Sequence, residues 1–379
     1  MRHTWRALMR LALKAALIVL AVNIAFALLN PVPALGRLSA YHVLLPPRLR
    51  LPFGETPERA YNLSLFDLNA MFASHAIAAP KAKDEFRVVL LGDSSTWGFL
   101  LRPENTLSGL LNAMQLRTAD GRRVCVYNLG YPIMSLAKDL LILRQAMSHQ
   151  PDLVIWLVTL ESFPASAQLT HPLVQRNPEA MHALTIAYHL RSIADQARFT
   201  HASFIEHTFW GQRRALADWL RLQLYGVLWA ATGIDQDYPE SYEPAQRDLD
   251  PTLEWKGFHP PQLPEDALAF DVLEAGAQLA REGGAEFMLV NEPILISQGR
   301  NSDLRYNFFY PRWAYDTYRQ RLAERARQQR WHYLDAWNLV PPSEFTDSAV
   351  HLTPRGSQLL AEQLAALLSA LPLKERERR

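Results

Sequence analysis

The amino-acid sequence predicts an α/β fold: a doubly wound, parallel five-stranded sheet with helices on both faces and a helical insertion. Short runs rich in valine, leucine and isoleucine, typical of buried strands, alternate with longer segments of helical apolar spacing. This alternation is typical of parallel strands joined by crossover helices, which cover both faces of the sheet. One long stretch, residues 164–266, breaks the alternation and therefore predicts an insertion.

The same patterns predict the position of each element of the main domain, which we expect to span residues 86–371. Strands are expected at residues 87–91, 124–128, 153–158, 286–290 and 332–334. Helices are expected between and after them, at residues 105–117, 136–148, 267–281, 313–328 and 356–371.

Residues 1–30 are predicted to anchor the chain in a membrane. Three arginines lie ahead of an apolar stretch, residues 11–29, which only Lys14 and Asn23 interrupt. About 20 apolar residues span a bilayer and basic flanks stay in the cytoplasm, so we expect a single-pass protein whose main domain is extracytoplasmic. A cleaved signal peptide, with Ala25-Phe26-Ala27 as its cleavage site, and a buried helix are the alternative interpretations.

Three further segments complete the expected organisation. Residues 31–85 begin as a proline-rich extended connector and continue as a packed helical segment. The insertion has a helical first part with three tryptophans and an irregular second part rich in proline, tyrosine and charge. Such a stretch is typical of a lid or a binding loop, although a purely structural insert fits equally well. Residues 372–379 predict a solvated, charged tail.

The composition excludes several classes of function. The chain has 39 basic and 38 acidic residues, and this balance offers no electrostatic case for nucleic-acid binding. Its one cysteine, Cys125, rules out an internal disulfide and a cysteine-based zinc site, and we interpret it as a core residue. The chain has no phosphate-binding loop, dinucleotide fingerprint or zinc-protease motif, so no cofactor and no metal are expected.

The most informative local pattern follows the first expected strand, where the chain reads Gly92-Asp93-Ser94. Ligands of doubly wound sheets bind outside the carboxyl ends of the strands, so a serine placed here can present its hydroxyl to a substrate. Asp and Ser are also ordinary residues at the start of a helix, and for this pattern alone the two interpretations are equally good.

A second pattern lies near the other end of the chain. Thr353 and Pro354 are typical of the first positions of a helix, which leaves Asp347 and His351 in the loop just before it. A serine nucleophile needs a base within hydrogen-bond reach, and the base needs a carboxylate that orients it. Ser94, His351 and Asp347 are therefore the candidate catalytic residues.

With these two motifs the chain resembles the SGNH, or GDSL-like, hydrolase family. The resemblance covers about residues 86–371 apart from the insertion, and rests on Gly-Asp-Ser and on His351 followed by Leu-Thr-Pro-Arg-Gly. It implies a doubly wound, flavodoxin-like sheet and action on carboxylic esters, often acyl or acetyl groups on carbohydrate or lipid. It also implies an oxyanion hole formed by the backbone N–H groups of Ser94 and Gly130, the latter in the family's second block at residues 127–131.

Two departures from the family pattern bear on activity. The aspartate usually stands three residues before the histidine, whereas Asp347 stands four before it, so either a triad or a Ser94–His351 dyad is expected. The third block normally supplies an asparagine that donates to the oxyanion, but here Glu161 takes its place and, when ionised, only accepts. Asn291, at the end of the fourth strand, is a candidate substitute donor, and a structural role in the strand-end turn is the favoured alternative.

Three functions remain open at this point. The first is an extracytoplasmic, membrane-anchored ester hydrolase, and the second is an O-acyltransferase that uses the same serine on a cell-surface polymer. Several similar single-anchor proteins work beside a multi-span membrane acyltransferase, which is the partner this resemblance implies. The third function is an inactive protein that binds a glycan or a partner, and Glu161 is the main feature that favours it.

Overall fold

The computed structural model describes residues 2–54, 64–194, 203–242 and 248–370. Its centre is a five-stranded, all-parallel sheet in the order β2-β1-β3-β4-β5. Because the first strand lies between the second and the third, the chain winds outward in both directions, and the doubly wound α/β prediction is confirmed. The strands are β1 (Glu85–Leu91), β2 (Arg123–Asn128), β3 (Leu153–Val158), β4 (Glu286–Asn291) and β5 (His332–Asp335).

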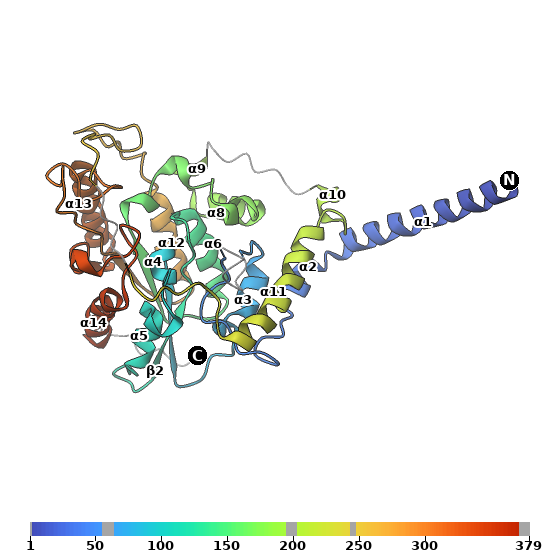
Figure 1. Ribbon diagram of the computed structural model, residues 1–379, viewed down its shortest axis with the longest axis horizontal. Helices are drawn as coiled ribbons and strands as arrows, with labels where there is room; N and C mark the ends of the chain where they lie inside the picture. Colours follow the sequence, from blue (N-terminus) through green and yellow to red (C-terminus); the bar gives the residue numbers. More distant parts are fainter. Residues whose placement is uncertain (1, 55–63, 195–202, 243–247, 371–379) are drawn as a thin grey trace.

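Helices cover both faces of the sheet (Figure 1). Successive strand side chains point to opposite faces, so Val89 and Leu91 belong to one hydrophobic cluster and Val88 and Leu90 to another. The first cluster packs against α6 (Leu136–Met147), α12 (Phe270–Glu282) and α13 (Arg312–Gln329). The second packs against α5 (Leu107–Ala113) and α14 (Pro354–Ala370). Helix α5 is shorter than expected, because Met114 caps it and Gln115 takes a left-handed conformation with φ of 51°.

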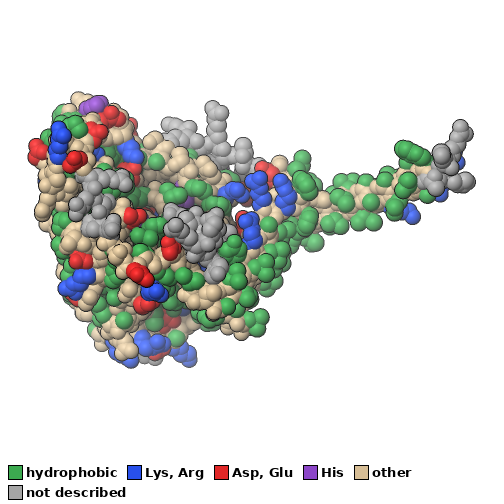
Figure 2. Space-filling view, in the orientation of Figure 1, with side chains coloured by type: hydrophobic (Ala, Val, Ile, Leu, Met, Phe, Trp, Pro, Cys, Tyr) green, Lys and Arg blue, Asp and Glu red, His purple; other side chains and the backbone are tan. Residues whose placement is uncertain are grey.

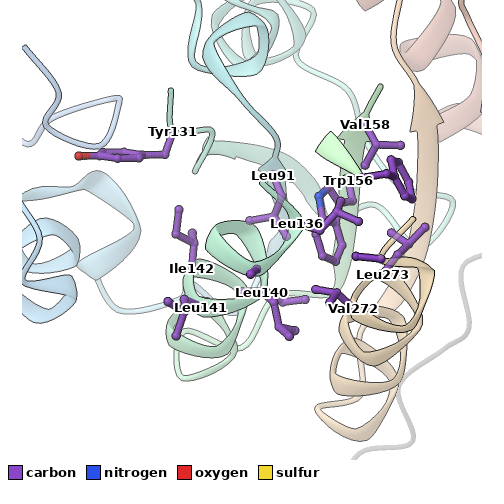
Figure 3. Packing of buried hydrophobic residues seen from close by; sticks show 14 of the residues in the cluster. Leu91, Tyr131, Leu136, Leu140, Leu141, Ile142, Trp156, Val158, Val272 and Leu273 are labelled. Atoms are coloured by element: carbon purple, nitrogen blue, oxygen red, sulfur yellow. The ribbon is translucent and has the colours of Figure 1, made fainter. Parts of the chain in front are cut away.

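Trp156 of β3 lies at the centre of the larger cluster, between α6 and α12 (Figure 3). A Cβ atom at Gly276 would lie 2.1 Å from the indole ring, so α12 approaches the sheet closely only because this residue is glycine. The indole N–H donates to Asp139 of α6 over 3.2 Å. Cys125, by contrast, is half-buried at the edge strand β2 and not in the core as expected.

The N-terminal helix α1 (Arg2–Leu29) projects away from the domain (Figure 1). Within the described part of the chain, its segment Trp5–Leu29 is the one helix long and apolar enough to cross a membrane. Its large apolar side chains are exposed, Leu17 and Leu20 among them, which contradicts the interpretation as a helix buried within the domain.

The segment after α1 is packed into the domain and is not the extended connector that its prolines predict. It forms α2 (Val32–Gly36) and then runs beneath the first turn after β1, where the guanidinium of Arg50 is fully buried. Arg50 donates to Asp235 over 2.8 Å and to the carbonyls of Gly98 and Leu101, each over 3.0 Å. A buried cation needs such partners, and they hold the segment against the domain. Within the expected helical segment, the described residues form α3 (Leu68–Ser74) and the short helix η1 (Ala76–Ala78), whereas residues 64–67 are not helical.

The insertion is helical in its first part, as expected, and largely irregular in its second. Its helices are α7 (Pro172–Gln175), α8 (Pro178–Tyr188), α9 (Arg191–Ala194), α10 (Phe204–His207) and α11 (Arg213–Thr232). Helices α10 and α11 lie beside α1 and α2 rather than over the sheet (Figure 1). The expected tail at residues 372–379 lies outside the described residues.

Candidate functional site

Ser94 is presented at the carboxyl end of β1, where the chain turns sharply into α4 (Ser94–Trp97). Gly92 makes this turn with φ of 152°, and a Cβ atom there would lie 2.2 Å from the Thr96 hydroxyl. Asp93 caps the helix, because its carboxylate accepts the backbone N–H of Ser95 over 2.7 Å. Ser94 is thus the first residue of α4 and stands above the sheet edge.

His351 and Asp347 are presented by a short loop that an antiparallel bridge between Phe345 and Leu352 closes at its base. Inside this loop the N–H of Thr346 donates to the carbonyl of His351 over 2.9 Å. The side chain of Thr353 caps α14 by accepting the N–H of Gly356 over 3.1 Å, as the sequence predicts. The loop therefore has little freedom to change the relative positions of Asp347 and His351.

The structure brings the three candidate catalytic side chains together in one line. His351 Nε2 lies 2.8 Å from Ser94 Oγ, and His351 Nδ1 lies 2.9 Å from Asp347 Oδ1. The spacing of four residues between Asp347 and His351 therefore allows the carboxylate to reach the imidazole. Of the two arrangements left open by the sequence, the geometry has the form of the triad.

The surroundings of the imidazole favour an ionised Asp347. The hydrogen bond from His351 lowers the pKa of Asp347, and the hydroxyl of Thr346 also donates to its carboxylate, over 3.0 Å. On the other side, the ring of Phe99 packs on that of His351 with centroids 5.0 Å apart. An ionised carboxylate on Nδ1 favours the tautomer in which Nε2 is the acceptor, which is the form that can remove a proton from Ser94.

Gly130 also lies next to the serine turn, at the end of β2. A Cβ atom at Gly130 would lie 2.6 Å from the backbone nitrogen of Trp97, so only glycine allows this close packing against α4. Its N–H donates to Asn128 Oδ1 over 3.1 Å, and Asn128 in turn donates to the carbonyl of Thr96 over 2.9 Å. This packing accounts for the glycine by itself, and the oxyanion role of Gly130 stays a prediction.

The side chain of Asn291, the candidate substitute oxyanion donor, is held by residues of β5 and α13. Asn291 ends β4 on the face that α13 covers, and its side chain is fully buried. Its amide donates to Asp335 Oδ1 over 2.8 Å, and its carbonyl oxygen accepts the hydroxyl of Tyr318 over 3.1 Å. The strand places this amide in a hydrogen-bond network with β5 and α13, which accounts for the asparagine by itself, and its oxyanion role stays a prediction.

Glu161 follows β3, the neighbour of β1 in the sheet, and forms an ion pair with Lys256 of the insertion. The lysine reaches it from a tight turn that the bridge between Trp255 and Phe258 closes. This turn also lines a cavity of about 380 Å³. The ammonium group of Lys256 can donate hydrogen bonds at this edge of the sheet. The ionised carboxylate of Glu161 can only accept them. No local feature of the sequence predicts this contact, because Lys256 lies 95 positions after Glu161 (256 minus 161) in an irregular segment.

Glu292 is the second residue whose place the sequence does not predict, since no local pattern distinguishes it from an ordinary residue of the turn after β4. It is buried directly after β4, and neither of its carboxylate oxygens has a hydrogen-bond partner among the described residues. Burial raises the pKa of Glu292 well above its ordinary value, and the neighbouring Asp93 carboxylate raises it further. Burial therefore favours the protonated form of Glu292 beside the serine turn.

The described residues contain no group of three or more His, Cys, Asp or Glu side chains placed to hold a metal ion.

No family model matches the sequence, and no curated protein matches it. Among solved structures, the chain is similar to a GDSL-like lipase from Bacteroides thetaiotaomicron, with 11% identity over 80% of this chain and 97% of that one and a TM-score of 0.40. It is similar to an aryl esterase from M. smegmatis, with 14% identity, 74% and 97% of the two chains covered, and a TM-score of 0.35. It is also similar to a carbohydrate acetylesterase family member from Sinorhizobium meliloti, with 13% identity, 75% and 100% covered, and a TM-score of 0.33.

Proposed function

We propose that this chain is a serine ester hydrolase of the SGNH type that removes acyl groups, most simply acetyl, from an extracytoplasmic carbohydrate or lipid. The observation that carries the proposal is the line of hydrogen bonds from Ser94 through His351 to Asp347, with distances of 2.8 and 2.9 Å. A serine hydroxyl is a weak nucleophile, and such a line is the arrangement that activates it.

The reaction follows from the positions of these groups. Ser94 Oγ attacks the ester carbonyl while its proton passes to His351 Nε2, and Asp347 stabilises the imidazolium that forms. His351 then returns the proton to the departing alcohol, which leaves an acyl group on Ser94. Water attacks this acyl-enzyme with His351 again as the base, and the acid is released with Ser94 restored.

The negative charge on the attacked carbonyl oxygen needs hydrogen-bond donors. The N–H of Ser94 is available, because the first residue of a helix has no intrahelical acceptor for it. The N–H of Gly130 can serve once its bond to Asn128 opens. Loss of one donor reduces transition-state stabilisation by about 2.7–4 kcal/mol, so Glu161 in the third position predicts a slow enzyme rather than an inactive one.

Helix α1 supports an extracytoplasmic setting, since it is long enough to anchor the domain and the arginines at its start favour the cytoplasm. In that setting the acyl-enzyme can also be attacked by a sugar hydroxyl. The chain would then act as an O-acyltransferase on a cell-surface polymer, beside a multi-span membrane acyltransferase that supplies the acyl group. The two activities differ only in the acceptor, so one experiment can separate them.

The test uses the full-length protein in detergent, with Ser94→Ala and His351→Ala variants and with Ser369→Ala as a matched control at the exposed end of α14. Each is treated with a fluorophosphonate probe and assayed for release of p-nitrophenol from p-nitrophenyl acetate. Labelling and turnover should vanish in the Ser94 variant, fall strongly in the His351 variant and persist in the control.

Acetyl transfer to an added oligosaccharide, with no free acetate, would identify the transferase instead. Absence of labelling in the unmodified protein would contradict both catalytic proposals and favour the inactive binding protein.

A further inference from the structure

An apolar surface covers the outer side of α10 and α11. We define this α10–α11 apolar surface by Ile205, Trp210, Leu220, Leu224, Val227 and Leu228. Ile205, Trp210 and Leu224 are 71%, 67% and 66% exposed, although all three are large apolar residues. Soluble proteins rarely expose so many such residues together unless the surface binds something.

The residues on α11 form a stripe along one side of the helix. Leu220, Leu224, Val227 and Leu228 are spaced at i, i+4, i+7 and i+8, which places them on one face. The opposite face packs on the domain, where a Cβ atom at Gly226 would lie 2.1 Å from the hydroxyl of Tyr41. The stripe therefore points away from the protein core and has no partner among the described residues.

The surface is continuous with helix α1. Phe209, just after α10, packs edge-on against Phe26 of α1 with centroids 5.6 Å apart, and the N–H of Trp210 donates to Asn23 over 3.1 Å. Both α1 residues lie inside the segment Trp5–Leu29 that is long enough to span a bilayer. Helix α11 then runs across the inner end of α1 (Figure 1), and apolar side chains extend from α1 onto this side of the domain (Figure 2).

Arginines border the surface where α11 begins. Arg213 is exposed and lies over the ring of Trp210, with 4.8 Å from its guanidinium carbon to the ring centroid. Arg213 and Arg214 also line a cavity of about 780 Å³ beside α2, together with Arg144 and Arg176 and with two aspartates. Tryptophan and arginine at the edge of an apolar stripe are typical of a helix lying at the level of lipid headgroups.

We propose that α10 and α11 lie in the interface of the bilayer that α1 spans, with the apolar surface among the acyl chains and the arginines beside phospholipid phosphates. The inference rests on the anchoring role of α1 given above but not on the esterase activity. Lipid is the occupant because the contact with α1 places α10 at the depth of the last turns of the spanning segment. The α10–α11 part of the insertion is thus a second membrane contact, whereas its later segment reaches the edge of the site through Lys256.

The membrane contact is linked to the serine turn through the end of α11. Shortly after this helix, Asp235 binds Arg50, which in turn binds the carbonyls of Gly98 and Leu101 just beyond α4. This chain of buried contacts ties the height of the site above the bilayer to the position of α11.

The test places nitroxide labels on the full-length chain in phospholipid nanodiscs without any other protein. Cys125 is replaced by serine, and single cysteines are introduced as Leu224→Cys and Leu228→Cys in the stripe. Leu17→Cys serves as a reference within the bilayer and Gln358→Cys, on the exposed side of α14, as a reference in water. Power saturation then compares collision with oxygen, which is concentrated in lipid, and with a water-soluble nickel complex.

We expect labels at 224 and 228 to fall between the labels at 17 and 358, with several-fold more collision with oxygen than the label at 358. If the label at 17 lies in lipid while those at 224 and 228 behave like the one at 358, the surface is not in the membrane and the proposal is wrong. A label at 17 that behaves as in water would overturn the anchor and this surface together. Fluorophosphonate labelling of the same variants reports separately whether the serine site is intact.

Discussion

His351 Nε2 lies 2.8 Å from Ser94 Oγ, although 257 positions of the chain separate the two residues. Ser94 reaches this point through the turn after β1, and His351 through the loop before α14, on opposite sides of the insertion. Each loop is held by its own backbone, through the turn at Gly92 and the bridge between Phe345 and Leu352, so the contact depends on how β1 and α14 are placed in the fold. The predictions below test this site and the contacts that support it.

Asp347→Asn should lower kcat by about 10²- to 10⁴-fold while the chain keeps its fold. The amide cannot stabilise the imidazolium, and it favours the wrong tautomer of His351 by donating to Nδ1. Steady-state kinetics with p-nitrophenyl acetate measures the effect, and Asp303→Asn, an exposed carboxylate in a distant loop, is the control. A variant that retains most of its kcat would show that Ser94 and His351 act as a dyad.

Lys256→Gln should lower kcat/KM by about tenfold, because it leaves the Glu161 carboxylate uncompensated at the edge where the ester binds. The double variant Lys256→Gln with Glu161→Gln should recover most of this loss, since no uncompensated charge remains. Lys256 is half-exposed, so the coupling between the two sites should weaken as salt is added. Additive losses in the double variant would mean that the ion pair has no part in activity.

Glu292→Gln should make the protein more stable than the unmodified chain at alkaline pH. The folded chain keeps a proton on Glu292, because burial raises its pKa, whereas the unfolded chain releases it above pH 4.5 or so. The folded state then binds more protons, so the free energy of unfolding falls as the pH rises through the pKa of the folded state. Glutamine has nearly the same shape as protonated glutamate and has no proton to release in this range. Tm measured from about pH 5 to about pH 9 should therefore decline less in the variant.

Equal slopes of Tm against pH in the two proteins would contradict the raised pKa of Glu292 in the folded chain. Glu104→Gln, at an exposed carboxylate ahead of α5, is the control for loss of one carboxylate.

His171→Asn should reduce the sensitivity of the fold to acid. Burial lowers the pKa of His171 from 6.5 to about 3, and its two nitrogens meet the N–H of Leu173 and the carbonyl of Pro132 over 3.0 and 3.1 Å. Below pH 6.5 the unfolded chain takes up a proton that the folded chain refuses, so stability is present above this pH and is lost as the pH falls toward 3. An asparagine side chain can still accept the N–H of Leu173 at the start of α7, but it takes up no proton in this pH range.

The measurement is Tm as a function of pH from neutral downward. The variant should start from a lower Tm at neutral pH, because it loses the bond to Pro132, and then decline less steeply. A steeper decline than in the unmodified protein would refute the assignment. His75, whose pKa burial also lowers to about 3, should add a similar effect.

The sequence alone was sufficient for the parallel sheet and for the main candidate residues. Each strand is a short apolar run whose pattern is local, and the predicted and observed strands differ by two residues at most, at the start of β1. Ser94 and His351 could be found because each lies in a short motif beside a helix start, where local residue preferences are strong. Asp347 could be named as a candidate, but its distance from the imidazole could not be predicted.

Only the tertiary structure decided which side chains meet across the sheet. The face of β4 on which Asn291 falls directs its amide to Asp335, and the fold of the insertion brings Lys256 to Glu161 and Asp235 to Arg50. The same fold places the apolar stripe of α11 beside the end of α1 and not over the serine. Local patterns report the period and the ends of each element, whereas these contacts depend on how distant elements pack. They are therefore set by the crossovers and the insertion, which no short stretch of sequence contains.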